Sequence, residues 1–162
     1  MQWREVVEHP SLKDLPFKIE TNEWGKIMMT PASDAHGVYQ MEIAGLLKSL
    51  AKEGRVSTEC PVQTSRGVRV ADVAWRSAQF LKKHGIRKLA LPESPELVVE
   101  IESPSNSAAE LEEKRLLYFD VGAREFWLCG EDGKMRFFSP RGELRRSEMF
   151  GDFPDHIDID VA

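Results

Sequence analysis

The sequence predicts a mixed α/β domain, in which a mixed central sheet is flanked by helices, with a β-hairpin near the N-terminus and a β-meander near the C-terminus. Short segments rich in β-branched and aromatic residues alternate with amphipathic stretches of helical period. The pair Asp132-Gly133 is typical of a tight turn between antiparallel strands. A length of 162 residues suits one domain. We therefore expect a single domain over residues 1–162, with residues 1–16 as an N-terminal arm.

The N-terminal half is predicted to contain a hairpin, one long helix and a pair of strands. After a helical or irregular arm, two strands surround the turn-like residues 21–25. Ser33 or Asp34 can cap a helix over residues 35–52, whose apolar side chains recur at helical spacing, and Gly54 ends it. The strands of this half are expected at residues 17–20, 26–29, 55–63 and 67–75.

The C-terminal half centres on one strand and the helix that follows it. Pro95 and Pro104 bound a short run of β-branched residues, which predicts a buried strand. Ser107 and Glu110 have the spacing of a capping box, so a helix is expected over residues 108–121. The other elements expected are a short helix at 77–85 and strands at 97–101, 125–129, 134–138, 143–146 and 157–161.

Composition argues against several classes of protein. The apolar fraction of 41% and the charged fraction of 30% are those of an ordinary globular domain. Cys60 and Cys129 lack CxxC spacing and nearby histidines, so we expect reduced thiols and neither a zinc site nor a disulfide framework. The chain has no signal-peptide pattern and no apolar run of about 18 residues, which favours a cytoplasmic protein without a membrane span. The net charge of −5 gives no general attraction to nucleic acid.

The central strand and the helix after it combine carboxylates with a lysine. Alternation places Glu100 and Glu102 on the same face of the strand. In the helix, Lys114 shares the inner stripe with Leu111 and Tyr118. A lysine in such a stripe either extends its apolar stem along the surface or points at an anionic group. An acidic strand facing a lysine predicts a site for a metal ion and a water molecule.

A further acidic residue, Asp72, lies on an apolar strand face. Val68, Val70 and Asp72 alternate onto one side of their strand. A carboxylate at that position is costly unless it is paired or bound to a cation. The alternative is an aspartate at a strand end that reaches into the next turn. From the residues alone, both interpretations stay open.

Together, these motifs resemble the Uma2-like family, also called DUF820, of the PD-(D/E)XK nuclease superfamily. The resemblance covers roughly residues 17–138 and depends on the order and spacing of the motifs. The matching segments are EIESPS at 100–105, Lys114 four residues before Tyr118, GAREFW at 122–127, MTP at 29–31 with His36 and Gln40, and ADV at 71–73. The resemblance implies a restriction-endonuclease-like core.

The resemblance also implies a metal-dependent DNA endonuclease that acts as a homodimer. Asp72 and Glu100 correspond to the acids that hold a divalent cation, Mg²⁺ or Mn²⁺, which activates a bound water. Lys114 corresponds to the lysine that assists this water and offsets charge in the transition state. Glu102 is a candidate further ligand of the cation. The residues expected to support the ligands are Gln40 and Ser103.

The sequence departs from the superfamily pattern at one position, and other functions stay open. The usual lysine lies two residues after the strand acid, but that position is Glu102 here. Glu102 can add a ligand, bind a second cation, or make the site too negative for DNA. A structural alternative leaves Glu100 and Glu102 on an exposed edge strand and pairs Lys114 with glutamates of its own helix. The alternative functions are a nuclease-fold binding or regulatory module that does not cleave, and a phosphodiesterase acting on RNA or nucleotides.

Overall fold

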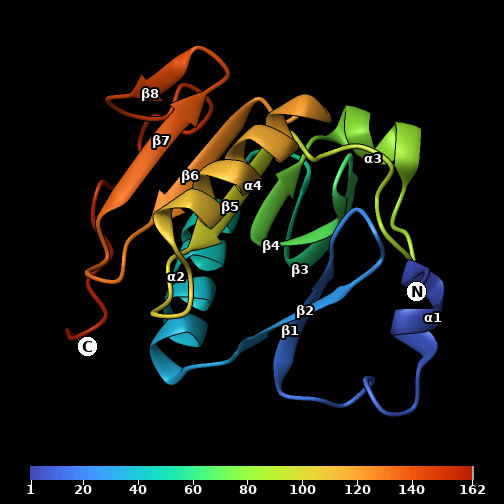
Figure 1. Cartoon of the computed structure of the whole chain (residues 1–162). Coiled ribbons are helices and arrows are strands. Elements are labelled where there is room, and N and C mark those ends of the chain that lie inside the picture. Colours follow the sequence, from blue (N-terminus) through green and yellow to red (C-terminus); the bar gives the residue numbers. More distant parts are fainter. Residues whose placement is uncertain (162) are drawn as a thin grey trace.

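The structure is a computed structural model that describes residues 1–161 (Figure 1). In chain order, its helices are α1 (Trp3–Glu8), α2 (Asp34–Leu50), α3 (Ala78–His84) and α4 (Ala108–Asp120). Its strands are β1 (Phe17–Thr21), β2 (Ile27–Pro31), β3 (Arg55–Thr64), β4 (Gly67–Arg76), β5 (Leu97–Ile101), β6 (Glu125–Cys129), β7 (Met135–Ser139) and β8 (Gly142–Leu144). The expected helices and strands therefore form, with ends that differ by one or two residues, apart from the last expected strand.

The topology confirms the mixed α/β fold class. One six-stranded sheet has the order β3-β4-β5-β6-β7-β8, and β1 and β2 form a separate antiparallel hairpin. Strands β5 and β6 run parallel, whereas the other neighbouring strands in the described residues pair in antiparallel fashion. The sheet is therefore mixed, and β6, β7 and β8 form the expected C-terminal meander.

The expected strand at residues 157–161 is wrong. This segment meets the sheet through a bridge between His156 and Lys134, and through the N–H of Ile157, which donates to the carbonyl of Gly133. Beyond that point, the carboxylate of Asp158 accepts the N–H of Asp160. A local bond of this kind offers the backbone an alternative to a strand ladder. Residues 157–161 alternate between apolar and acidic side chains, but they do not pair with a neighbouring strand.

Helices α2 and α4 cover opposite faces of the sheet (Figure 1). On the α2 face, Ile43 and Leu47 pack in a core with Trp127, which is fully buried. On the α4 face, Tyr118 packs against Phe126 in a second, smaller core. Two apolar layers therefore hold the sheet from both sides, as a sheet with two buried faces requires.

Local chemistry fixes the ends of α4 and so the direction of its inner side chains. Ser107 Oγ accepts the N–H of Glu110, and the Glu110 side chain accepts the N–H of Ser107, which completes the expected capping box. Past the other end, Gly122 adopts a φ of 109°, where glycine is favoured. The register set by these ends directs Lys114 and Tyr118 toward the sheet, where both are buried.

The β1–β2 hairpin completes the part of β4 that β5 does not reach. Strand β5 pairs with β4 only alongside residues 73–75. Closer to the start of β4, the N–H of Val68 donates to Thr21 Oγ1 at 3.0 Å, and the N–H of Val70 donates to Glu20 Oε2 at 2.8 Å. Side chains of β1 therefore take the place of a neighbouring strand, which brings the hairpin beside the point where β4 and β5 separate.

Both cysteines are free thiols and are buried in strands of the sheet. Cys60 lies in β3 and Cys129 lies in β6. Across residues 1–161, none of the helices has the length and apolar character needed to cross a membrane.

Candidate active site

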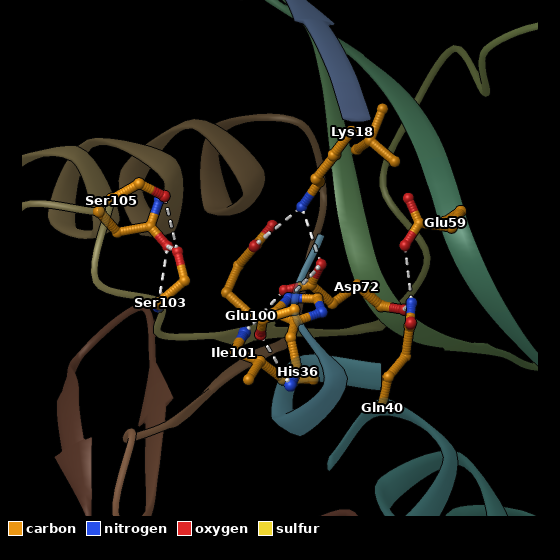
Figure 2. Close-up of polar contacts among 12 residues, drawn as sticks. Lys18, His36, Gln40, Glu59, Asp72, Glu100, Ile101, Ser103 and Ser105 are labelled. Carbon is orange, nitrogen blue, oxygen red and sulfur yellow. Dashed lines mark hydrogen bonds and ion pairs between the residues drawn. The ribbon is translucent and has the colours of Figure 1, made fainter. Parts of the chain in front are cut away.

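Five charged side chains meet beside the hairpin, next to the point where β4 and β5 separate. We call this group the charged cluster, and its members are Lys18 and Glu20 of β1, Asp72 of β4, Glu100 of β5 and Lys114 of α4. Figure 2 shows three of them, Lys18, Asp72 and Glu100. The two carboxylates at its centre, Asp72 and Glu100, expose only 1% and 2% of their side chains. Buried charges are costly, and strongly perturbed ionisable groups concentrate at functional sites. The cluster is therefore the candidate active site.

Asp72 accepts hydrogen bonds on both carboxylate oxygens. Its Oδ2 accepts the backbone N–H of Ile101 at 2.7 Å, which links β4 to β5 beyond their last ladder pair. Its Oδ1 lies 3.0 Å from Lys18 Nζ and 3.3 Å from His36 Nε2. The backbone thus fixes one oxygen, while the other faces two side chains that are able to carry positive charge.

Glu100 is held in a similar way. Its Oε1 accepts hydrogen bonds from Lys114 Nζ at 3.1 Å and from the Tyr118 hydroxyl at 3.0 Å. Its Oε2 lies 3.3 Å from Lys18 Nζ. Asp72 and Glu100 therefore each direct one oxygen at the same ammonium group. This arrangement excludes the alternative in which Glu100 faces solvent on an edge strand.

Lys114 lies between two carboxylates. Its Nζ is 2.7 Å from Glu20 Oε2 and 3.1 Å from Glu100 Oε1. Because Glu20 Oε2 also accepts the N–H of Val70, this ion pair ties α4 to β1 and β4. Lys114 therefore points into the protein and not toward the exposed glutamates of its own helix.

When all its groups are ionised, the charged cluster carries an excess of negative charge, because three carboxylates face two ammonium groups. Burial raises the pKa of Glu100 to about 7, against the opposing charges of Lys114 and Lys18. Burial also favours a higher pKa for Asp72, but the charge of Lys18 and the hydrogen bond of His36 outweigh it and hold that pKa well below its usual range. Asp72 is thus the ionised carboxylate at neutral pH, and a further cation would favour the ionised form of Glu100 as well.

Of the two residues expected to support the ligands, Gln40 contacts the cluster and Ser103 does not. Gln40 Nε2 donates to the backbone carbonyl of Asp72 at 2.8 Å and to Glu59 Oε1 at 2.7 Å, so it holds Asp72 from behind. Ser103 belongs to the turn between β5 and α4, where its N–H and its hydroxyl both donate to Asn106 Oδ1 (Figure 2). Ser103 therefore shapes the turn and does not contact the carboxylates.

Glu102 is not brought together with the other expected site residues. It follows Ile101, the last residue of β5, and lines an open pocket of about 370 Å³ together with Arg115 and Arg136. Because β5 ends at Ile101, Glu102 lies outside the strand, and the alternation that would place it on the same face as Glu100 no longer applies. The structure thus unites Asp72, Glu100 and Lys114 and leaves Glu102 in a neighbouring pocket.

Sequence reasoning missed Lys18 and Glu20, and gave His36 no role. Lys18 and Glu20 are two residues apart in a strand, so the sequence predicts that both lie on one face of it. The sequence does not show which residues pack against that face, because Lys18 contacts residues 54 and 82 positions away. His36 was part of the resemblance, and its place beside Asp72 follows from the start of α2.

An open pocket of about 250 Å³ lies between the hairpin and α2 and reaches the cluster. Lys18, His36, Gln40 and Glu59 contribute to its lining. The side chains of Lys18 and His36 expose 12% and 21% of their surface, so they separate the pocket from the more deeply buried carboxylates. We call this space the α2 pocket. A molecule that enters it meets Lys18 and His36 first.

The two central carboxylates fit a magnesium or manganese ion. Mg²⁺ is commonly held by one or two carboxylates, while waters and substrate phosphates complete its octahedral shell. Asp72 Oδ1 and Glu100 Oε2 face one shared position, and the cluster has negative charge in excess. Within residues 1–161, there is no group of three or more His, Cys, Asp or Glu side chains placed to hold a metal by itself. The donor set therefore suits a cation shared with a substrate better than an all-protein cage.

The fold is a mixed α/β domain, in which two paired carboxylates and two lysines lie where β4 and β5 separate. Over residues 17–158, the chain matches the model of the Uma2 family, described as "Putative restriction endonuclease". The chain therefore belongs to the Uma2 family, as its motifs predict. Its fold is similar to a crystal structure of a putative nuclease belonging to DUF820 from Anabaena variabilis ATCC 29413, with a TM-score of 0.71, 20% sequence identity, and coverage of 88% of this chain and 87% of that chain. No curated protein matches the chain.

Proposed function

We propose that this protein is a metal-dependent nuclease that hydrolyses phosphodiester bonds in DNA. The observation that carries the proposal is the approach of Asp72 Oδ1 and Glu100 Oε2 to one shared position beside an open pocket. Membership of a family described as restriction endonucleases supports a nuclease, and so does the fold. We also propose a homodimer, because cutting both strands of a duplex calls for two sites, and sedimentation analysis measures this directly.

In the proposed site, Asp72 and Glu100 would hold Mg²⁺ or Mn²⁺, and the carbonyl of Ile101 is a candidate further ligand. When bound, the ion polarises a phosphodiester oxygen and lowers the pKa of a water molecule. The protein prepares the ligands in advance. The N–H of Ile101 holds one oxygen of Asp72, and Lys114 with Tyr118 holds one oxygen of Glu100. Carboxylates fixed in this way need little rearrangement when substrate binds.

The proposed reaction is a hydrolysis. The water oxygen bonds to phosphorus, and the bond between phosphorus and the leaving sugar oxygen breaks. One proton of the water passes to solvent, and the leaving oxygen takes up a proton in exchange. The resemblance to the Uma2-like family implies that Lys114 assists this water. Because Lys114 Nζ contacts Glu20 and Glu100, we propose that it acts by positioning Glu100, and a direct contact with the water stays a prediction.

Nicking of supercoiled plasmid DNA tests the proposal. The wild-type protein should nick the plasmid with Mg²⁺ or Mn²⁺ and stop when a chelator is added. The near-isosteric changes Asp72→Asn and Glu100→Gln should each slow nicking by at least about 100-fold. The matched control Glu148→Gln changes an exposed glutamate and should nick at the wild-type rate. Metal-dependent cleavage of RNA or nucleotides alone would favour the phosphodiesterase, and metal binding without any cleavage would favour a binding module.

A further inference from the structure

We infer that Lys18 is a displaceable counter-ion, which occupies the cation position between Asp72 and Glu100 in the metal-free protein and contacts the scissile phosphate when a divalent cation is bound. This inference rests on the proposed nuclease function and adds a catalytic residue to it. The sequence offered no lysine for this role other than Lys114, because Lys18 lies on a strand far away in the chain.

The first argument is the difference between the two oxygens of each carboxylate. Asp72 Oδ2 is held by a backbone N–H, and Glu100 Oε1 is held by the buried pair of Lys114 and Tyr118. The opposite oxygens, Asp72 Oδ1 and Glu100 Oε2, share one partner, the Lys18 ammonium, at 3.0 Å and 3.3 Å. The protein therefore presents two ligand oxygens to one position, and a side-chain cation fills that position.

The second argument is electrostatic. In the metal-free protein, the Lys18 ammonium lies 3.0 Å from Asp72 Oδ1 and 3.3 Å from Glu100 Oε2, so it offsets part of their negative charge. A divalent cation between the same two oxygens supplies more positive charge at the same place. Two like charges at such short distance repel strongly in a buried site. The ammonium and the divalent cation therefore compete for the carboxylate pair.

The third argument is that the α2 pocket offers space for a second position of the Lys18 side chain. This side chain lines the α2 pocket, and the lysine head is a compact charge on a flexible four-carbon stem. The strand that carries it is paired with β2 over all five residues, so the backbone stays in place while the side chain moves. A displaced Lys18 would lie in the α2 pocket beside His36. Because this pocket reaches the two carboxylates, it is also the place where the scissile phosphate would bind, and a positive charge there stabilises the transition state.

Lys114 provides the contrast, although it also borders an open pocket. Its Nζ contacts Glu20, which is not directed at the shared cation position, and the oxygen of Glu100 that faces away from that position. A divalent cation at Asp72 and Glu100 leaves Glu20 still in need of a counter-ion. Lys114 is therefore expected to stay in place, so the two lysines should respond to substitution with opposite signs.

Calorimetric titration with Mn²⁺, combined with plasmid nicking, tests the inference on the wild type, Lys18→Met and Lys114→Met. Removing the competitor in Lys18→Met should tighten Mn²⁺ binding at least about 10-fold, yet slow nicking at least about 100-fold because the phosphate contact is lost. Lys114→Met should weaken Mn²⁺ binding. A purely structural Lys18 would give weaker Mn²⁺ binding in Lys18→Met as well, and that result would overturn the inference.

Two further measurements keep the outcome clear. Lys18→Gln retains a polar group in the buried site and should give the same signs as Lys18→Met if the methionine variant does not fold. Nicking by Lys18→Met at the wild-type rate would overturn the inference while leaving the nuclease proposal intact. If the wild-type protein neither binds Mn²⁺ nor nicks DNA, the proposed function itself fails, and this inference fails with it.

Discussion

The apolar core beneath α2 and the charged cluster beside the hairpin are two regions of the same sheet that are buried by different chemistry. In the core, the Trp127 ring lies 4.5 Å from Phe153 and 5.1 Å from Phe137, measured between ring centroids. Such contacts are individually weak, numerous and tolerant of similar shapes. In the cluster, each charge depends on one or two named partners. The core therefore specifies the fold, whereas the cluster is a costly arrangement of buried charges, which is typical of a functional site.

The largest expected loss of stability comes from the core. Trp127→Ala removes a fully buried ring and should lower the free energy of unfolding by about 3–5 kcal/mol, measured by urea denaturation. Trp24→Ala is the matched control, because Trp24 is 78% exposed and its loss should change stability by less than about 0.5 kcal/mol. Mn²⁺ should stabilise the wild type and Trp127→Ala to the same extent, so the difference in unfolding free energy between them should not change. A loss below about 1 kcal/mol would show that this core is not the main support of the sheet.

The next effect is a pH dependence that only the cluster should show. The folded-state pKa of Glu100, about 7, lies above its ordinary value of 4.5, so the folded protein binds the extra proton between these values. Stability should therefore fall as the pH rises from about 4.5 to about 7 in metal-free buffer. Glu100→Gln removes this proton site and should lack that part of the decrease. Identical pH profiles of unfolding for the two proteins would contradict the assigned charge state.

Removing a tyrosine hydroxyl from each region compares a hydrogen bond in the charged cluster with one at the apolar core. The Tyr118 hydroxyl donates to Glu100, whereas the Tyr39 hydroxyl donates to the neutral carbonyl of Glu131. At pH 8, Glu100 is ionised because its pKa is about 7, and hydrogen bonds to charged groups are stronger than bonds to neutral ones. At that pH, Tyr118→Phe should cost about 1.5–3 kcal/mol and Tyr39→Phe about 0.5–1.5 kcal/mol in thermal or urea unfolding. Tyr118→Phe should also weaken Mn²⁺ binding, while Tyr39→Phe should leave it unchanged. Equal Mn²⁺ affinities for both variants would separate Tyr118 from the proposed site.

The smallest effect concerns the two thiols, which lie in the apolar parts of the sheet. Burial raises the pKa of Cys129 to about 12, and it also raises the pKa of Cys60. Because the thiolate is the reactive form, the native protein should react with a colorimetric disulfide reagent at pH 8 far more slowly than the urea-unfolded protein. Rapid modification of one thiol in the native protein would mean that the sheet opens locally more readily than its packing indicates.

The sequence predicted the elements that depend on interactions between residues close together in the chain, and it failed where distant residues must meet. The strand at residues 97–101 and the helix after it were predicted almost to the residue, because their prolines, capping box and glycine act locally. The C-terminal alternation at 157–161 misled, since a strand also needs a partner edge. The membership of Lys18 and Glu20 in the site was out of reach for the same reason, because tertiary structure alone brings them to β4 and β5.

In the candidate site, too, the sequence predicted the local arrangement of residues better than their contacts in three dimensions. Asp72, Glu100 and Lys114 came together because the motif fixed them relative to a strand and a helix. Glu102 was grouped with Glu100 by alternation alone, and the end of β5 at Ile101 separates the two. Which lysine faces the proposed cation position depends on the side-chain geometry of Asp72 and Glu100. Spacing in the sequence carries no information on which oxygen a lysine meets.

The most direct test of the account is a crystal of the wild-type protein grown with Mn²⁺, with the anomalous signal of manganese used to locate the ion. The account predicts a peak at about 2.0–2.2 Å from Asp72 Oδ1 and Glu100 Oε2, with Lys114 still on Glu20 and with Lys18 moved into the α2 pocket. A fully occupied Lys18 between the carboxylates, with no peak beside them at saturating Mn²⁺, would contradict the account.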